Sequence, residues 1–212
     1  MRPKILYIYD ALCGWCYGFS PVMQALFAAY QERVDFDVLS GGMILEDRVG
    51  SINEKAPFIK TAYRHVEEVT GVLFGEAFLK DMMESGAMQL NSLKPGLALT
   101  TLKAIDSSQA VPFARALQRA VYFDGRHPDG WEMYASLAET IGLRGDDFVN
   151  QMQEETVLQQ TQAEFEAVKK MSIYGFPTVL WIDGQSGYVL TRGYSPLSAL
   201  KKSVEQLLLE YT

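Results

Sequence analysis

The sequence predicts an α/β protein in which a four-stranded mixed sheet is flanked by helices and interrupted by an all-α insertion. Residues 4–39 have the pattern of a strand, a helix and a second strand. Residues 156–212 have the pattern of a helix, two strands and a closing helix, and the stretch between these parts shows no convincing strand. We therefore expect residues 1–55 and 156–212 to form one discontinuous domain around an insertion at 56–155.

The composition supports a globular protein and excludes several kinds of partner. The chain has 212 residues, of which 48% are hydrophobic, and its net charge is −7. A chain this acidic, without a basic cluster, is not expected to bind nucleic acid or an anionic membrane. No apolar run approaches the ~18 residues of a membrane span, and the first residues lack the pattern of a secretory signal. The sequence thus predicts a cytoplasmic protein.

The first part of the chain reads as strand, helix, strand. Residues 4–9 are β-branched and aromatic and stop at Asp10, as in a buried strand. The helix that follows has apolar residues at spacings of three and four and is predicted to kink near Pro21. Residues 34–39 then alternate between apolar and polar side chains, which predicts a strand with one covered face.

The middle of the chain is predicted to contain only helices. Glycines separate the apolar periodic segments, and Pro95 and Pro112 stand where first-turn prolines occur. The expected helices lie near residues 57–69, 75–84, 95–107, 112–123, 130–141 and 146–153. We interpret them as an insertion that packs on the opening unit.

The last part returns to mixed structure. A helix over 156–171 precedes Gly175-Phe-Pro-Thr178, which leads into a continuous apolar strand at 179–182. A turn cluster separates this strand from a second one at 188–191. Ser195 and Pro196 then start a closing amphipathic helix.

The only two cysteines of the chain, Cys13 and Cys16, form a Cys-Gly-Trp-Cys motif at the first strand-to-helix turn. Disulfide exchange needs one activated thiolate and a second thiol within reach. A cysteine at the start of a helix is favoured as a thiolate by the helix dipole, and a cysteine one turn later is shielded. We expect Cys13 to be the attacking nucleophile and Cys16 the resolving thiol. Gly14 and Trp15 between them add no positive charge, so we expect a moderately reducing or near-neutral redox potential.

These two motifs together carry a resemblance. Residues 9–21, which hold the Cys-Gly-Trp-Cys motif after the first strand, and Gly175-Phe-Pro-Thr178 before a late strand are similar to the DsbA-like branch of the thioredoxin superfamily. Within that branch, the whole chain most resembles the cytosolic FrnE-like group of dithiol-disulfide oxidoreductases and isomerases. The resemblance implies a thioredoxin-like fold that a helical insertion splits.

The same resemblance implies how the site binds a substrate. The family's proline that matches Pro177 is cis and lies against the cysteine pair. Phe176 would then offer its backbone N–H and C=O to an extended substrate strand, and Gly14 and Trp15 would flank the same groove. The chain departs from the family pattern at Ala11, where proline is common, and at Phe176, where a β-branched residue is more usual.

Several alternatives stay open at this point. Zinc would need two more ligands, and His65 and His127 are isolated from each other and from the cysteines, so no metal is expected. Pro177 could be an ordinary proline at the start of a strand. Three aromatic residues of the insertion are expected in its core, with a place in the groove above Cys13 as the alternative for some of them: Tyr122, Phe123 and Trp131.

Two classes of function remain. The first is a thiol-disulfide oxidoreductase or isomerase that acts on protein or small-molecule disulfides and thiols, with the Cys13–Cys16 disulfide as its redox group and no bound cofactor. Glutathione or a redoxin would regenerate it, and the protein would be a monomer or homodimer. The second is a glutathione-dependent isomerase or kappa-type glutathione transferase, since these relatives share the insertion topology. They use a single activated hydroxyl or thiol, so the presence of Cys16 favours the first class.

Overall fold

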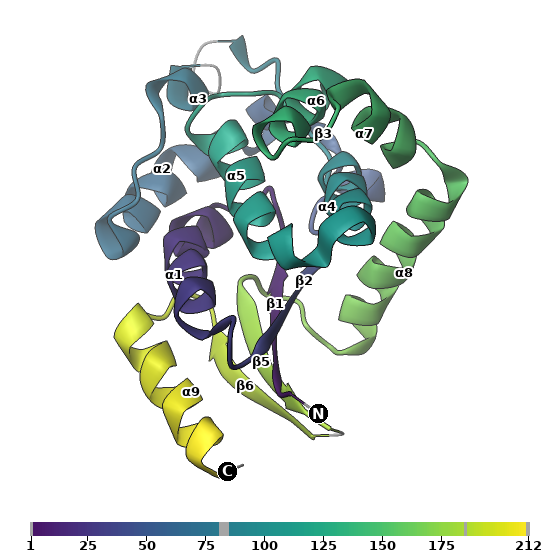
Figure 1. Ribbon diagram of the computed structural model, residues 1–212. Coiled ribbons are helices and arrows are strands. Elements are labelled where there is room, and N and C mark those ends of the chain that lie inside the picture. Colours follow the sequence, from purple (N-terminus) through teal and green to yellow (C-terminus); the bar gives the residue numbers. More distant parts are fainter. Residues whose placement is uncertain (1, 81–84, 185, 211–212) are drawn as a thin grey trace.

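One mixed sheet of four strands forms the centre of the protein, in the order β2-β1-β5-β6 (Figure 1). The computed structural model describes residues 2–80, 85–184 and 186–210. β1 pairs with β2 in parallel, whereas the β1–β5 and β5–β6 pairs are antiparallel. This is the predicted sheet, and its strands are β1 (Lys4–Tyr9), β2 (Asp35–Ser40), β5 (Thr178–Asp183) and β6 (Ser186–Arg192).

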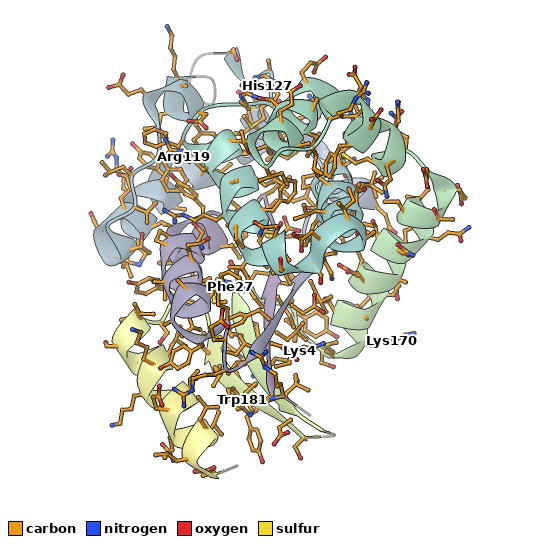
Figure 2. The ribbon with its side chains drawn as sticks, viewed as in Figure 1. Lys4, Phe27, Arg119, His127, Lys170 and Trp181 are labelled. Atoms are coloured by element: carbon orange, nitrogen blue, oxygen red, sulfur yellow. The ribbon has the colours of Figure 1, made fainter. Side chains whose placement is uncertain are left out.

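Helices cover both faces of this sheet. Ile5, Tyr7 and Tyr9 of β1 join a large core with α1 (Gly14–Tyr30) and α9 (Leu197–Glu210). The alternate residues Leu6 and Ile8 pack with Val168 of α8 (Glu155–Lys170) on the other face. A strand buried on both faces is apolar throughout, which explains the uninterrupted run in the sequence. Figure 2 shows Phe27 on α1 and Trp181 on β5, which both contribute to the larger core.

Among the described residues, six further helices lie between β2 and α8 in the chain and gather at one end of the sheet (Figure 1). α5 packs on α1, and α4 packs on α8. The helix predicted at 75–84 is present as α3, and residues 81–84 lie outside the described residues. The helices are α2 (Ile52–Thr70), α3 (Glu76–Lys80), α4 (Leu93–Asp106), α5 (Ala110–Tyr122), α6 (Trp131–Thr140) and α7 (Gly145–Met152). Short 3₁₀ turns occur at Glu46–Arg48 and Ser107–Gln109.

The structure differs from the sequence predictions in three places. α2 begins at Ile52, before the predicted residue 57, because the Ser51 hydroxyl caps it by accepting the Asn53 N–H at 3.2 Å. The predicted boundary between residues 55 and 56 therefore falls inside a helix. β4 (Gln89–Leu90), inside the stretch expected to lack strands, pairs with β3 (Gly50–Ser51), which precedes that stretch, and two residues are too few to show alternation. As predicted, α1 continues beyond Pro21, to Tyr30.

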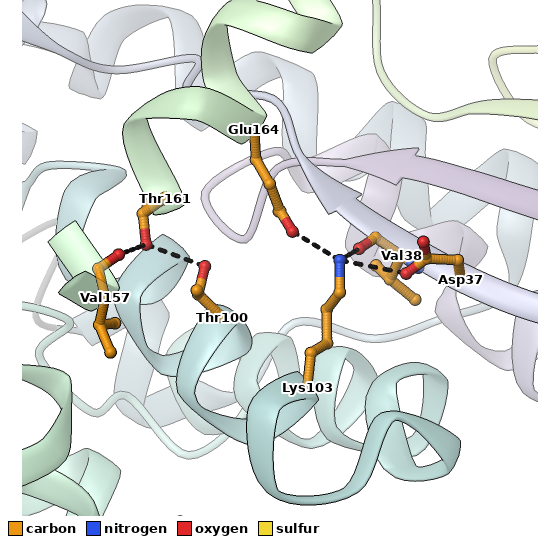
Figure 3. A network of polar contacts seen from close by, with 7 residues as sticks. All are labelled: Asp37, Val38, Thr100, Lys103, Val157, Thr161 and Glu164. Atoms are coloured by element: carbon orange, nitrogen blue, oxygen red, sulfur yellow. Dashed lines mark hydrogen bonds and ion pairs between the residues drawn. The ribbon is translucent and has the colours of Figure 1, made fainter. Parts of the chain in front are cut away.

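A partly buried ion-pair network joins the insertion to the sheet (Figure 3). Lys103 Nζ of α4 lies 3.1 Å from Asp37 Oδ1 and donates to the Val38 carbonyl of β2 at 2.8 Å. The same Nζ lies 2.5 Å from Glu164 Oε1 of α8. Burial raises the pKa of Glu164, and the charge of Lys103 opposes that rise. One ammonium group thus holds three elements together.

In the described part of the chain, no helix is both long enough and apolar enough to cross a bilayer.

Candidate functional site

The two cysteines stand where β1 gives way to α1. The Cys13 N–H donates to the Asp10 carbonyl at 3.1 Å, which closes the turn after the strand. Cys13 itself is extended, with φ −95° and ψ 113°, and is the N-cap residue of α1, so the helix begins at Gly14. The Tyr17 N–H donates to the Cys13 carbonyl at 3.0 Å and forms the first turn. The Cys13 side chain therefore lies at the N-terminal end of α1, where the first backbone N–H groups of a helix have no intrahelical partner.

The two thiols differ in access to solvent. Cys13 is 8% exposed and Cys16 is fully buried. The Cys13 thiol donates to the Phe176 carbonyl at 3.5 Å. Of the two cysteines, Cys13 is therefore the one closer to solvent, and it also lines a cavity described below.

Cys16 is held in its protonated form. Burial raises the pKa of the Cys16 thiol well above its ordinary value, and the hydrogen bond and charge interaction with Cys13 raise it further. The Asp10 backbone opposes this rise weakly. A thiol with a raised pKa ionises less readily and reacts second. The burial of Cys16 and the raised pKa that it causes therefore predict one order of reaction, in which Cys13 reacts first and Cys16 second.

The strand pairing brings the far end of the chain to the cysteines. Ile8 of β1 pairs with Thr178 of β5, so the residues that precede Thr178 lie beside the turn that follows β1. The Phe176–Pro177 peptide bond is cis, as the resemblance implies. Gly41, which follows β2, lies under the Phe176 ring, because a Cβ at position 41 would come within 2.1 Å of Phe176 Cζ. Only glycine allows this close approach.

Asp10 is a buried carboxylate that ties three segments together. Its Oδ1 accepts from the Leu12 N–H at 2.9 Å and from the Ser92 hydroxyl at 3.0 Å. Its Oδ2 accepts from the Met43 N–H at 2.7 Å. Burial raises the pKa of Asp10, and these hydrogen bonds oppose the rise. The carboxylate thus fixes the cysteine turn to the segments after β2 and before α4.

Replacing Asp10 with asparagine is expected to destabilise the protein by about 1–3 kcal/mol, the cost of leaving a buried polar group without a partner. An amide has one acceptor oxygen, so its NH₂ group would face either the Met43 N–H or the donors at Oδ1. Urea denaturation followed by circular dichroism measures the change. Asp146→Asn at the start of α7 serves as the control, and an equal loss in both variants would contradict the assigned role of Asp10.

A cavity of about 460 Å³ opens beside Cys13, between the cysteine turn and the insertion. Cys13, Gly14 and Trp15 form one wall. The Trp15 ring packs edge-on against His65 of α2, with ring centroids 5.5 Å apart. The opposite walls come from the segment after β2, from α2, α3 and α5, and from β4, through residues that include Ile44, Arg48, Ala62, Tyr63, Val66, Phe74, Phe78, Leu90 and Tyr122.

The predicted substrate-binding residues lie beside Cys13. Cys13, Gly14 and Trp15 line the cavity, and Phe176 meets Cys13 through its carbonyl. Among the described residues, no group of three or more histidine, cysteine and acidic side chains is arranged to hold a metal ion. His127 lies 4.0 Å from Asp129 in the loop before α6, away from the described residues that line the cavity.

The three aromatic residues of the insertion have different environments. Tyr122 is buried in the core, as predicted, and it also lines the cavity beside Cys13, which was the alternative. Trp131 is partly buried against the core. The core prediction was wrong for Phe123, which is 39% exposed. It follows the last residue of α5 and lies under the Arg119 guanidinium, whose position Figure 2 shows.

Sequence reasoning missed several site residues. Asp10 was read only as the end of a strand, although an aspartate two residues before a backbone N–H is a known turn former. Gly41 was read as a strand terminator. Arg48, Tyr63 and Val66 carried no local signal, because their proximity to Cys13 arises only from how the insertion packs.

Comparison with known proteins agrees with this geometry. A family model described as the DSBA-like thioredoxin domain matches residues 4–205. No curated protein matches the chain. Among solved structures, the chain is similar to a proposed protein disulfide isomerase from Nitrosomonas europaea, with a TM-score of 0.88 and 25% identity over 100% of both chains.

A second similar structure is the cytosolic disulfide reductase DsbM from Pseudomonas aeruginosa. Its TM-score is 0.82 and its identity 24%, over 97% of this chain and 99% of that chain. The same reductase with GSH gives a TM-score of 0.79 and 24% identity, over 96% and 98% of the two chains. Because the family model spans nearly the whole chain, the protein belongs to the DSBA-like thioredoxin domain family.

Proposed function

We propose that this protein is a thiol-disulfide oxidoreductase in which Cys13 is the nucleophile and Cys16 the resolving thiol. One observation carries the proposal: a slightly exposed cysteine is the N-cap residue of α1, and a fully buried cysteine lies one turn behind it. This arrangement separates the two roles that disulfide exchange requires. Family membership supports the same chemistry.

The proposed reaction has two steps. The Cys13 thiolate attacks one sulfur of a substrate disulfide, the substrate S–S bond breaks, and one substrate thiolate leaves with the electron pair. Cys16 then loses its proton to the thiolate that left in the first step and attacks Cys13 Sγ, which releases the second substrate group as a thiolate. The substrate gains two electrons, and the protein is left with a Cys13–Cys16 disulfide.

The backbone beside Cys13 supports the proposed way of holding a substrate. The Phe176 carbonyl already accepts from the Cys13 thiol, so an acceptor stands at the reacting sulfur. A substrate segment that lies along Phe176 and Pro177 would bring its sulfur to this point. Gly14 and Trp15 would form the other side of that site, because both line the cavity.

A thiol must regenerate the dithiol form, and we propose glutathione or a redoxin for this task. The similar reductase from Pseudomonas aeruginosa is described as cytosolic and has a structure with GSH. This likeness supports a cytoplasmic reductase or isomerase, and the absence of a positive charge at Gly14 and Trp15 supports a moderately reducing or near-neutral potential. Every residue assigned a role comes from one chain, so a monomer or a homodimer would suffice.

A glutathione-dependent isomerase or transferase explains the site less well. Such an enzyme needs one activated hydroxyl or thiol and gives no role to Cys16. Here Cys16 is buried directly behind Cys13, and interaction with Cys13 raises the pKa of Cys16. A dithiol-disulfide mechanism gives a role to both Cys13 and Cys16.

The Cys16→Ser variant tests the proposal, because it is expected to stop after the first step. Incubation with a cysteine-containing disulfide peptide should leave a mixed disulfide on Cys13, which intact-mass spectrometry detects as one added thiol. The adduct should disappear with dithiothreitol. The wild-type protein, treated alike, should instead lose two protons and keep no adduct. A Cys16→Ser protein that never forms the adduct would refute the assignment of Cys13.

A further inference from the structure

The cavity beside Cys13 is large enough for a whole small molecule. Its volume is about 460 Å³, whereas a cavity of about 150 Å³ already holds benzene. Pockets for drug-sized ligands span about 300–1,000 Å³. One hydrophobic side chain of a protein substrate would leave most of this space empty.

The lining of the cavity selects for an apolar, aromatic occupant. Five aromatic side chains contribute to its walls, and they are Trp15, Tyr63, Phe74, Phe78 and Tyr122. The Phe74 ring makes edge-to-face contacts with Tyr63 and with Tyr122, with ring centroids 5.7 Å and 5.4 Å apart. Such walls pack well against another ring. Because Cys13 also lines this cavity, a bound ring would place an attached sulfur next to the nucleophile.

One positive charge stands at this site. Arg48 is the only charged residue among the described residues that line the cavity. Within the described part of the chain, Arg48 has no carboxylate partner within 4.0 Å. Burial raises the pKa of Asp10, and the charge of Arg48 opposes that rise. Arg48 is exposed, so it marks the mouth of the cavity rather than its floor. A ligand carboxylate there would gain a partner.

We propose that the cavity binds the apolar body of a small aromatic disulfide that carries a carboxylate, with the carboxylate at Arg48 and one sulfur at Cys13. This inference rests on the proposed function and adds the substrate class. In the first step, Cys13 forms a bond to the aryl sulfur, and the other aryl thiolate leaves with the electron pair. In the second, Cys16 attacks Cys13 Sγ and releases the bound aryl thiol, so one disulfide gives two thiols and oxidises the pair.

Single-turnover kinetics of the reduced protein test this proposal. The probes are dithiobis(nitrobenzoate), an anionic aryl disulfide, and dithiodipyridine, a neutral one, since both release a coloured thiol. Hydroxyethyl disulfide is the small polar reference, followed by acid quench and mass spectrometry. For the wild-type protein, the rate with dithiobis(nitrobenzoate) should saturate with concentration, because a complex precedes the attack. A rate that stays linear up to the solubility limit would overturn binding in the cavity.

Two variants on α2 distinguish binding in the cavity from general effects. Ala62 lines the cavity, and Ala62→Phe should fill part of it. We expect its rate constant for dithiobis(nitrobenzoate), relative to that for hydroxyethyl disulfide, to fall by about tenfold. Val69 is 42% exposed on the same helix and does not line the cavity, so Val69→Phe should match the wild type. Equal ratios in the two variants would overturn the proposal.

The charge is tested separately with Arg48→Gln, an exposed substitution that remains informative if Ala62→Phe does not fold. Its apparent dissociation constant for dithiobis(nitrobenzoate) should rise by about threefold, as for an exposed ion pair, and that for dithiodipyridine should not change. A rise with both probes, or with neither, would overturn the carboxylate assignment. Failure of the proposed function looks different: the wild-type protein would then form no Cys13–Cys16 disulfide with any probe, hydroxyethyl disulfide included.

Discussion

Replacing Cys13 with serine is expected to reduce disulfide turnover to the rate seen without protein. A serine hydroxyl does not ionise near neutral pH, and at this helix terminus no histidine or other base is in contact with residue 13 to activate it among the described residues. The remaining thiol, Cys16, is fully buried and its pKa is raised, so it cannot replace the nucleophile. Reduction of insulin disulfides in the presence of a thiol reductant, followed by turbidity, measures the loss.

The Cys16→Ser variant is the matched control for this experiment. It should also fail in repeated turnover, but it should still complete one attack, which a quenched single-turnover sample reveals. Cys16→Ser should therefore complete the first attack, which Cys13→Ser should not, and neither variant should complete the second step. Turnover that persists in Cys13→Ser would contradict the assigned role of Cys13. A first attack that occurs in Cys13→Ser and not in Cys16→Ser would reverse the roles of the two cysteines.

Replacing Lys103 with methionine is expected to lower the free energy of unfolding by about 2–3 kcal/mol, somewhat less than the about 3–5 kcal/mol lost when one partner of a fully buried ion pair is removed, because the three side chains are partly exposed. The Lys103 and Glu164 side chains are 16% and 17% exposed. Without the Lys103 ammonium of α4, the Glu164 carboxylate of α8 and the Asp37 carboxylate of β2 lose the counter-charge that they share. Urea denaturation followed by tryptophan fluorescence measures the change.

Two further variants make this measurement specific. Lys169→Met removes an exposed ion pair with Glu166, whose side chains are 71% and 60% exposed, and should cost at most about 1 kcal/mol. Lys103→Met combined with Glu164→Met removes both charges of the closest pair and should restore part of the lost stability. A similar cost for Lys103→Met and Lys169→Met would show that the network is solvated rather than buried.

Much of the fold could be predicted because its signals are local. The run from Lys4 to Tyr9 is apolar on both faces, and the residues from Val34 alternate, so β1 and β2 were placed within about a residue of their observed bounds. The two motifs with cysteine and proline indicated the site, and the antiparallel pairing of β1 with β5 brings them together. Periodicity located the helices of the insertion but not their ends, as the early start of α2 at the Ser51 cap illustrates.

The rest of the site depends on contacts that no local pattern encodes. Asp10 stabilises the cysteine turn through partners that lie far along the chain, at Met43 and Ser92. Gly41 is required because of a ring that belongs to residue 176. The cavity exists only where α2, α3 and α5 fold back over Cys13, so its shape and its one arginine could not be derived before the packing was known.

The deep burial of Cys16 has a consequence for the lifetime of the proposed mixed disulfide. In the proposed mechanism, a mixed disulfide on Cys13 would last until Cys16 ionises and attacks, and burial, which raises the pKa of the Cys16 thiol, disfavours that ionisation. During this interval a second thiol on a substrate protein would compete with Cys16 for the same bond. If Cys16 attacks first, the substrate leaves reduced; if the substrate's own thiol attacks first, it leaves with a rearranged disulfide. Under the proposed mechanism, the environment of one buried sulfur would therefore bias the substrate toward reduction or toward rearrangement.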